Sequence, residues 1–397
     1  MPTLRIEFLQ HLAQTSDAPM LLEIIKADGV HLFDVDGKKY MDLISGISVS
    51  NVGHHHPKVV EAIKKQVDDY MHLMVYGEYI QSPQVLLAKR LSELLPANLD
   101  SVYFVNSGSE AIEGAMKLAK RFTGRPHMVS FINAYHGSTQ GALSIGGNED
   151  LKNAFRPLIP GVKHIRFNDI DDLSLIDEHT ACVFAETIQG EAGVIVPQKD
   201  FLIALRNRCN ETGALLVLDE IQTGFGRTGS LFAFSNYGIV PDILCIAKGM
   251  GGGLPIGAFI SSKEIMSSLM SNPVLGHITT FGGNPVCCAA SLAVLDVLIE
   301  ENLMEQVAAK EQQFRQLLQH KAIKHISGKG LLLALEFETE DFNKKVIQEC
   351  INQSVIVDWF LFSGNKMRIA PPLIISEGEI SHACKIILNA IDAVINS

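Results

Sequence analysis

The chain has 397 residues and a formal net charge of −11 at pH 7; 47% of its residues are hydrophobic and 19% are charged. This composition predicts a globular protein with a large core and more than one domain, and the lack of a basic block argues against nucleic acid as a partner. Because no secretory signal or membrane-length apolar run stands out and the seven cysteines lack CxxC spacing, we expect a cytoplasmic location, no membrane association and reduced thiols.

The first part of the chain predicts a helix, a hairpin and two more helices. Residues 1–13 are expected to form a short amphipathic helix, and Phe33–Asp42 a hairpin that turns at Asp36-Gly37. Pro57 opens a helical pattern, since proline suits the first position of a helix, and Ser82-Pro83 opens another.

From about residue 100, short apolar runs alternate with helical patterns. The runs are Val102–Val105, Met128–Phe131, Cys182–Ala185, Ala214–Leu218 and Ile243–Ala247. The last two are too short for helices and suit strands that are buried on both faces. Such alternation predicts an α/β fold with a mostly parallel sheet covered by helices.

The pattern changes after Pro285. A long helical run at 285–319 leads to a strand at Leu331–Phe337, a helix near 341–353, a strand at Lys366–Ala370 and a last helix. This order of elements predicts a second, smaller α+β domain.

Two of the apolar runs lead directly into a charged residue, Asp219 in one case and Lys248 in the other. Ligands of open α/β sheets bind just outside the carboxyl ends of the strands, so we expect this carboxylate and this amine at the same edge. The glycines after Lys248 allow the backbone to approach a ligand closely. Desolvation lowers the pKa of a lysine and prepares its amine to attack a carbonyl. A solvated lysine that closes a strand is the simpler interpretation of such a residue taken alone.

A small polar loop, Asn106–Glu110, joins the strand at Val102–Val105 to a helical pattern. The free N–H groups and positive dipole end of a helix N-terminus favour an anion, and a phosphate would fit here. The alternative is a plain N-cap, in which Ser107 or Ser109 caps the helix.

Two more loops come directly after strand ends. Ala134–Gly137 contains Tyr135, an aromatic side chain that can stack on a flat ligand ring, although packing alone also explains it. Glu186–Gly193 carries two carboxylates, which in a glycine-bearing loop are more often structural than catalytic.

Two patterns point to other functions and are set aside. Gly224–Gly229 matches G-x-G-x-x-G, but a dinucleotide fingerprint must lead into a helix, and Gly238 and Pro241 interrupt the segment after this one. His54–His56 are three adjacent residues, which cannot all face one ion in regular structure. We therefore favour a loop that enters a helix over a metal site.

With these residues placed, the chain resembles the class III aminotransferases of fold type I, which depend on pyridoxal 5'-phosphate, and most of all the acetylornithine and ornithine aminotransferase group. The resemblance runs from GISVSNVGHHHP at 46–57 to MRIAPPLI at 367–374. Its specific parts are LLVLDEIQTGFGRTG at 215–229 and the lysine–glycine run after it.

The resemblance implies three segments. Residues 1–45 would pack with the small domain, 46–290 would form the large cofactor-binding domain, and 291–397 the C-terminal small domain.

The resemblance also implies how the chain would hold pyridoxal phosphate. Lys248 would be the Schiff-base lysine, and Asp219 would pair with the pyridine nitrogen. A charge pair at about 4 Å is worth ~4 kcal/mol at an effective dielectric of ~20, enough to keep that nitrogen protonated and the ring an electron sink. The other implied contacts are Ser107, Gly108 and Ser109 to the phosphate, Tyr135 and Ile221 to the ring, Gln222 to its phenolic oxygen, and Thr280 to the phosphate of the neighbouring subunit.

For the substrates, the resemblance implies that Arg368 binds the α-carboxylate of glutamate and that Glu191 pairs with Arg368 when a different substrate is bound. Thr279 is placed with the substrate residues. Because sites would be shared between subunits, a homodimer is expected. The chain departs from the group at Ser138, where an arginine usually grips a substrate carboxylate.

The implied reaction is a ping-pong transamination from an ω-amino acid such as ornithine or acetylornithine to 2-oxoglutarate. Ser138 puts acetylornithine in doubt, so lysine, 4-aminobutyrate or another amine remains open as donor. An aminomutase or decarboxylase would use the same scaffold, and a nicotinamide-dependent oxidoreductase would use Gly224–Gly229 instead.

Overall fold

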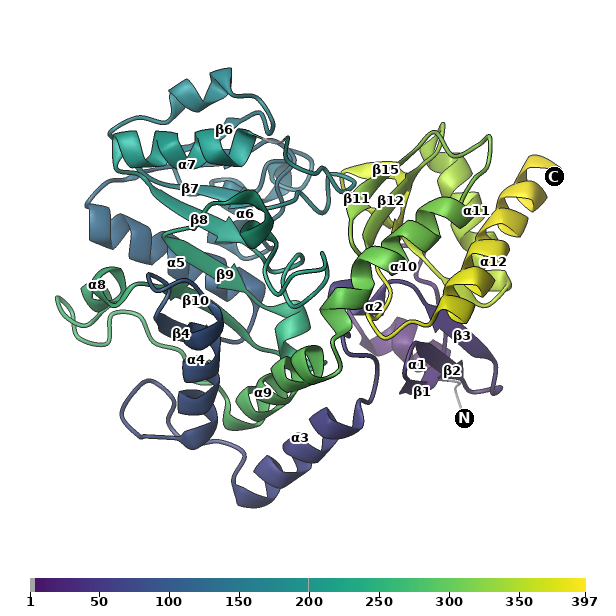
Figure 1. The fold of residues 1–397 in the computed structure, drawn as a ribbon, viewed down its shortest axis with the longest axis horizontal. Helices are drawn as coiled ribbons and strands as arrows, with labels where there is room; N and C mark the ends of the chain where they lie inside the picture. Colours follow the sequence, from purple (N-terminus) through teal and green to yellow (C-terminus); the bar gives the residue numbers. More distant parts are fainter. Residues whose placement is uncertain (1–3, 199) are drawn as a thin grey trace.

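Residues 4–198 and 200–397 are described by a computed structural model, in which helices surround three sheets. Figure 1 shows a larger lobe around a seven-stranded sheet and a smaller lobe around two four-stranded sheets. Helices α9 (Pro285–Glu300) and α10 (Leu303–Leu317) lead from the larger lobe to the smaller one. The predicted combination of a helix-covered, mostly parallel sheet with a smaller α+β unit is confirmed.

The seven-stranded sheet has the order β4-β10-β9-β8-β7-β5-β6. Its strands are β4 (Ser101–Val105), β5 (His127–Phe131), β6 (Val162–Ile165), β7 (Thr180–Glu186), β8 (Leu215–Asp219), β9 (Ile243–Ile246) and β10 (Gly257–Ser261). Only β10 runs against its neighbours; the other adjacent strands are parallel. All five predicted strands are present, whereas β6 and β10 were not predicted.

Both faces of this sheet are buried, as the apolar runs predicted. On β8, Leu216 and Leu218 pack into one hydrophobic cluster, and Leu215 and Val217 pack into the other. One face is covered by α5 (Gly108–Thr123), α6 (Gln140–Ile145) and α8 (Lys263–Met266), and the other by α3 (Pro57–Asp69), α4 (Ser82–Leu94), α7 (Phe201–Thr212) and α9. The sheet therefore exposes its strand ends, not its faces, to ligands.

The smaller lobe joins the two ends of the chain. Its first sheet has the order β1-β2-β3-β13 and its second β11-β12-β15-β14. The strands are β1 (Ile24–Asp28), β2 (His31–Asp34), β3 (Lys39–Asp42), β11 (His325–Lys329), β12 (Leu332–Glu336), β13 (Val355–Ile356), β14 (Asp358–Phe360) and β15 (Ser363–Ile369). Helices α11 (Glu340–Asn352) and α12 (Glu377–Ile395) pack against these sheets. Because β13 pairs with β3, the C-terminal part of the chain completes an N-terminal sheet.

The predicted hairpin is formed by β2 and β3, which pair antiparallel. Asp34 fixes its turn, since its Oδ1 accepts hydrogen bonds from the backbone N–H groups of Asp36 (3.0 Å) and Lys38 (2.8 Å). The short connecting elements are α2 (Ser45–Ser48), η1 (Asn153–Phe155), η2 (Asp171–Leu175), η3 (Ala233–Tyr237), η4 (Lys248–Gly251) and η5 (Ser267–Leu269).

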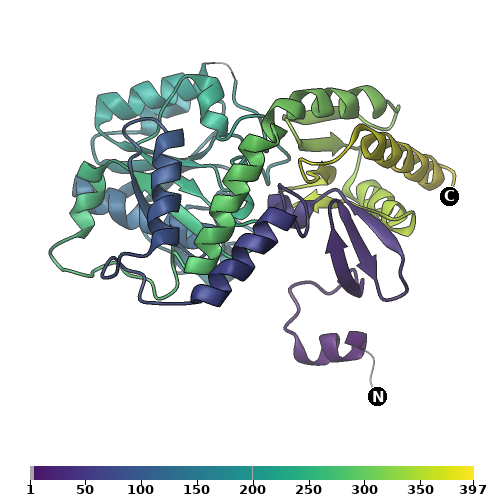
Figure 2. The ribbon, with the colours of Figure 1, turned by 60° about the horizontal axis from the view of Figure 1, so that its bottom comes forward.

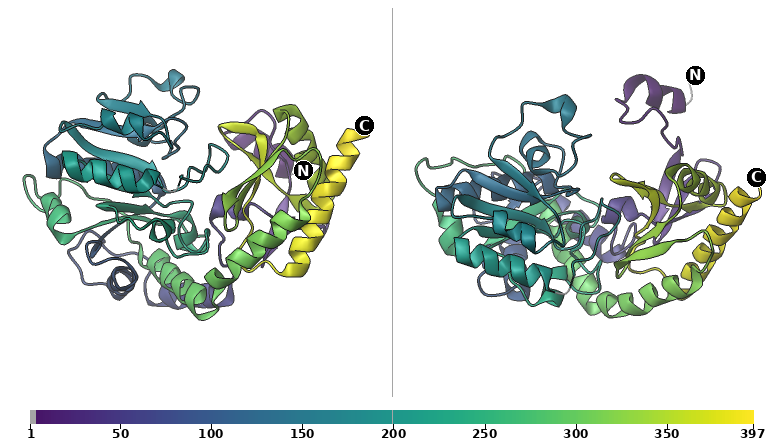
Figure 3. Two further views of the ribbon diagram at one scale, coloured as in Figure 1. Left: turned by 45° about the horizontal axis from the view of Figure 1, so that its top comes forward. Right: turned by 90° about the horizontal axis from the view of Figure 1, so that it is seen from above.

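Two expectations need correction. The helical run at 285–319 is two helices, because Asn302 adopts a left-handed conformation with φ 51° between α9 and α10. The amphipathic helix expected over 1–13 begins outside the described residues, and its described part, α1 (Leu4–His11), is not amphipathic, because its apolar side chains are not gathered on one face. None of its residues is buried, and it stands apart from the rest of the chain (Figures 2 and 3).

Over the residues described, none of the helices combines the length and apolar character needed to cross a membrane.

Candidate active site

Lys248 and Asp219 line the same cavity, which has a volume of about 420 Å³ and lies at the carboxyl ends of β8 and β9. Asp219 is the last residue of β8, and Lys248 begins the short helical turn η4 just after β9. Since these strands are adjacent and parallel, their ends meet at one edge of the sheet. The structure therefore brings the predicted amine and carboxylate together.

Lys248 has an unusual backbone and an environment that disfavours its charge. Its φ of 46° lies in the left-handed region, which a residue with a side chain seldom adopts unless its surroundings enforce it. Burial lowers the pKa of Lys248 below its ordinary value, although the carboxylate of Glu191 acts in the opposite direction. A larger neutral fraction of this amine makes it a better nucleophile and base.

Asp219 is buried and held from two sides. His136 Nδ1 lies 2.7 Å from one carboxylate oxygen, and the backbone N–H of Ile221 donates to the other at 2.9 Å. Asp219 is only 5% exposed, so these contacts fix its orientation toward the cavity. Sequence reasoning missed His136, since it lies 83 positions from Asp219 and only the pairing of strands brings them together.

The predicted anion site is the N-terminus of α5, where the structure confirms the alternative interpretation of an N-cap and leaves the anion site a prediction. Ser107 is the N-cap, and its hydroxyl accepts a hydrogen bond from the N–H of Glu110 at 3.2 Å. Ser107, Gly108 and Ser109 also line the cavity, so the first turn of the helix, whose early N–H groups have no partner within the helix, lies at its edge. A side chain at Gly108 would crowd Ile221, whose Cδ1 would lie 2.9 Å from an added Cβ. The cavity is thus lined by backbone at this point.

Glu186, at the end of β7, is a second acidic group in the cavity. Burial raises its pKa well above the ordinary value, and the nearby charge of Asp219 adds to this effect. Its Oε1 accepts from the N–H of Gly190 at 3.1 Å. Glu186 is therefore a second carboxyl group beside Asp219, in surroundings that disfavour its charged form. The loop pattern by itself did not distinguish Glu186 from Glu191, and the family resemblance gave a role only to Glu191.

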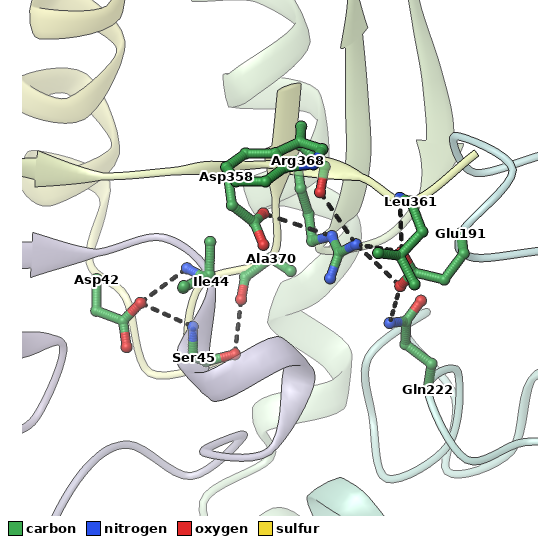
Figure 4. Close-up of polar contacts among 10 residues, drawn as sticks. Asp42, Ile44, Ser45, Glu191, Gln222, Asp358, Leu361, Arg368 and Ala370 are labelled. Carbon is green, nitrogen blue, oxygen red and sulfur yellow. Dashed lines mark hydrogen bonds and ion pairs between the residues drawn. The ribbon is translucent and has the colours of Figure 1, made fainter. Parts of the chain in front are cut away.

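On the far side of the cavity, Glu191 forms an ion pair with Arg368 (Figure 4). Arg368 Nη2 donates to the two carboxylate oxygens at 2.9 and 2.7 Å. Gln222 Nε2 and the backbone N–H of Leu361 also donate to Glu191, at 3.3 and 3.2 Å. Glu191 lines the cavity, and Arg368, only 2% exposed, lies behind it. Any carboxylate that reaches Arg368 from the cavity must displace Glu191.

Besides Arg368, three more predicted residues do not line this cavity within one chain. Ser138 is exposed, and its hydroxyl lies 3.1 Å from that of Tyr135, which does line the cavity. Thr280 is exposed, and Thr279 accepts a hydrogen bond from Asn106 Nδ2 at 3.1 Å. Asn106 lines the cavity, so the loop that carries both threonines reaches its rim.

The structure explains the two sequence patterns that were set aside, the glycine pattern at Gly224–Gly229 and the histidine run at His54–His56. No α-helix begins in 224–232 of the described chain, and η3 starts only at Ala233. Within that loop, Arg227 is fully buried and hydrogen-bonded to the rest of the protein. The histidines face different partners: His54 Nε2 lies 2.8 Å from Asp42, and His56 Nε2 lies 3.3 Å from Glu301. His56 is the N-cap of α3, as expected of a helix-entry loop.

Known proteins resemble the chain over nearly its whole length. The sequence profile of the family described as aminotransferase class-III matches residues 12–391. An acetylornithine aminotransferase of Methanopyrus kandleri is 38% identical over 96% of this chain and 97% of its own. A putrescine aminotransferase of Pectobacterium atrosepticum is 39% identical over 89% of this chain and 79% of its own. The crystal structure of an ornithine aminotransferase from Toxoplasma gondii superposes with a TM-score of 0.92 at 30% identity, covering 99% of this chain and 95% of that one.

Proposed function

Because the chain belongs to the class III aminotransferases, we propose that it moves an amino group from an ω-amino acid such as ornithine or acetylornithine to 2-oxoglutarate, with pyridoxal 5'-phosphate as cofactor. The two half-reactions would alternate in ping-pong order. The observation that carries the proposal is the meeting of Lys248, Asp219 and the N-terminus of α5 around one cavity.

The residues present fit this cofactor. The N-terminus of α5 suits a phosphate, and the proposed contacts are Ser107, Gly108 and Ser109. Gln222 Oε1 is buried without a hydrogen-bond partner among the described residues, so it is available to a ligand group. Tyr135 and Ile221 line the same cavity and are the proposed ring contacts.

When bound, the cofactor supplies an electron sink for the charge that develops at the substrate carbon. Asp219, oriented by His136, would place a negative charge beside the ring nitrogen. Lys248, whose pKa is lowered by burial, is suited to take a proton from the substrate carbon as a base and to donate it to the cofactor carbon as an acid. These two residues are the proposed catalytic groups.

The Glu191–Arg368 pair supports the use of two different substrates. Arg368 would bind the α-carboxylate of the acceptor once Glu191 leaves it, and Glu191 would keep the arginine neutralised while a donor amine occupies the cavity. A single-substrate aminomutase or decarboxylase has no need for this exchange, so the pair favours transamination.

A homodimer is the proposed assembly, because two neighbouring segments expose apolar side chains. His72 and Phe281 lie with ring centroids 4.9 Å apart, and Asn284 Nδ2 donates to the carbonyl of Met71 at 3.0 Å, which joins the segments. Their exposed side chains include Met71 (63%), Ile80 (96%), Met270 (73%), Val274 (72%) and Phe281 (56%). A patch of this kind marks an interface. A second copy bound there would bring its own Thr280 to a neighbouring site.

Ser138 favours a second class of donor. Since no arginine stands at this position to grip a donor carboxylate, amines without that carboxylate are candidates alongside ornithine and acetylornithine. Half-reactions with ornithine, acetylornithine, lysine, 4-aminobutyrate and simple amines, monitored by the visible absorbance of the cofactor, decide between them.

We propose to divide the chain at the predicted boundaries, with 1–45 and 291–397 in the small domain and 46–290 in the large one. The pairing of β3 with β13 supports the assignment of the N-terminal segment. We also place the enzyme in the cytoplasm, which suits seven cysteines that are all free and buried.

The decisive experiment is Lys248→Ala. We expect it to abolish turnover and the visible absorbance band of the lysine-bound cofactor while the protein stays folded. Lys310→Ala is the control, because Lys310 is also buried but donates to the carbonyl of Leu373, away from the cavity. Retention of both activity and absorbance in Lys248→Ala would falsify the assignment.

A further inference from the structure

Arg368 has a second acidic neighbour, Asp358, on its own hairpin. Strands β14 and β15 pair antiparallel, and Asp358 is directly opposite Arg368 in their register. Side chains of directly opposite residues lie on the same face of a sheet. The backbone ladder therefore keeps this carboxylate beside the arginine whatever happens in the cavity.

The guanidinium of Arg368 uses different atoms toward its two acidic neighbours. Nη2 donates to Glu191 and, at 3.4 Å, to the carbonyl of Trp359. Nε points the other way and lies 3.6 Å from Asp358 Oδ1 (Figure 4). The guanidinium carbon lies 4.6 Å from the centre of the Phe360 ring. Glu191 and Asp358 thus bracket the group from opposite edges, over one aromatic face.

The contact between Arg368 and Asp358 is incomplete. Arg368 Nε and Asp358 Oδ1 are both buried, and neither has a hydrogen-bond partner among the described residues. Their separation of 3.6 Å is longer than a hydrogen bond. Buried polar atoms are nearly always bonded, so a facing donor and acceptor that stop short of each other need an explanation.

The two carboxylates differ in what carries them. Glu191 lies in the loop after β7 of the larger lobe, whereas Asp358 belongs to the same hairpin as Arg368. When Glu191 leaves, Arg368 loses the carboxylate to which it is hydrogen-bonded, and a buried cation without such a partner is strongly unfavourable. Asp358 is the acidic group that remains next to it.

We propose that Asp358 is a positioning residue for the acceptor half-reaction: it holds Arg368 in place by completing the Nε hydrogen bond when Glu191 gives way to the acceptor's carboxylate. This inference rests on the proposed function, since it assumes that Arg368 binds that carboxylate. Glu191 is then the exchangeable partner of the arginine and Asp358 the resident one. The short gap is closed by a small shift of the guanidinium along its own plane.

The test measures glutarate binding to the cofactor-loaded enzyme by calorimetry, together with the two half-reactions. Asp358→Ala should weaken glutarate binding and raise KM for 2-oxoglutarate by about tenfold, which corresponds to about 1.4 kcal/mol. The kcat at saturating 2-oxoglutarate and the rate of the donor half-reaction should stay within about twofold, because Asp358 acts only when Glu191 has left Arg368.

Two further variants separate positioning from general damage. Asp358→Asn keeps an oxygen that accepts from Nε, so it should recover most of the lost glutarate affinity. Asp242→Ala removes a carboxylate that pairs with Arg206 at 2.7 Å at the opposite end of β9, and should lower stability without changing glutarate affinity.

The outcomes distinguish this inference from the proposed function. If the wild-type enzyme binds no glutarate and does not use 2-oxoglutarate, the acceptor assignment itself fails. If the wild type does both but Asp358→Ala binds glutarate normally, or impairs donor and acceptor equally without rescue by Asp358→Asn, the positioning role is wrong and the proposed function stands.

Discussion

Among the residues that the structure describes, two arginines are buried, and they have different kinds of partner. Arg227 is 0% exposed, and its Nη1 and Nη2 bond to neutral oxygens: the carbonyls of Leu331 and Pro371, the hydroxyl of Ser45 and the amide oxygen of Asn51. Arg368, 2% exposed, faces two carboxylates. Backbone carbonyls are fixed in the fold, so a guanidinium bound to them cannot exchange them for a ligand. A guanidinium bound to a side-chain carboxylate that can move away can make this exchange.

Arg227 joins separate parts of the structure, whereas Arg368 is the arginine proposed to bind the acceptor. Arg227 comes from the larger lobe's loop after β8 and reaches Ser45 and Asn51 on either side of the boundary after the N-terminal segment, and Leu331 and Pro371 in the smaller lobe. Burial lowers its pKa to about 9, although the charge of Asp42 acts in the opposite direction. Ser45 in turn donates to the carbonyl of Ala370, just past Arg368 (Figure 4). One arginine thus joins the parts of the molecule that position the other.

The largest effect is expected from Arg227→Leu. The substitution removes the donors for four buried acceptors, and each acceptor left without a partner costs ~1–3 kcal/mol. We expect the free energy of unfolding to fall by about 3–5 kcal/mol, measured by denaturant titration of the cofactor-loaded enzyme. Arg368→Leu is the matched comparison, because its site opens to the cavity and water can replace the lost donor. If Arg227→Leu is less destabilising than Arg368→Leu, the contrast between the two arginines is wrong.

The next effect concerns catalysis. Arg368→Leu removes a charge-assisted contact to the acceptor's carboxylate, so we expect KM for 2-oxoglutarate to rise about a hundredfold, equivalent to about 2.7 kcal/mol. Glu191 keeps its bonds from Gln222 and Leu361, and stability should therefore fall by less than about 2 kcal/mol. Steady-state kinetics with each substrate varied in turn measures the effect. An unchanged KM for 2-oxoglutarate would remove Arg368 from the acceptor site.

The smallest effect is a pH dependence at Asp358. Burial raises the pKa of Asp358 to about 7, although Arg368 acts in the opposite direction. An acid with a raised pKa in the folded state binds more protons folded than unfolded, so stability falls as the pH rises between the unfolded value and about 7. Asp358→Asn has no such proton to lose. Relative to the wild type, it should gain about 2 kcal/mol of stability between about pH 5.5 and 7, at ~1.4 kcal/mol per pH unit.

Thermal or denaturant unfolding of both proteins across this pH range tests the expectation. A constant difference between wild type and Asp358→Asn would mean that Arg368 keeps Asp358 ionised throughout. The same series with Asp242→Asn is a control for the loss of a carboxylate that pairs with an arginine elsewhere in the fold.

The sequence alone determined which reactive side chains follow the ends of the strands. Short apolar runs that lead into Asp219 and Lys248 were enough to place both residues at one sheet edge, because adjacent parallel strands end together. The helix N-terminus before α5 could also be predicted from local sequence, since a small polar segment between a strand and a helix exposes that N-terminus. Resemblance to a family then named the group that such a site would hold.

Only the tertiary structure decided which groups surround these residues. His136 meets Asp219 across 83 positions, and Arg227 meets Pro371 across 144; no periodicity or spacing encodes such contacts. The Asp358–Arg368 pair could not be predicted from local sequence either, although both residues lie in one hairpin, because their contact depends on the register in which β14 and β15 pair. A shift of one residue would send Asp358 to the other face of the sheet. Local pattern fixes which side chains a strand end presents, and the packing of distant segments fixes which charges those side chains meet.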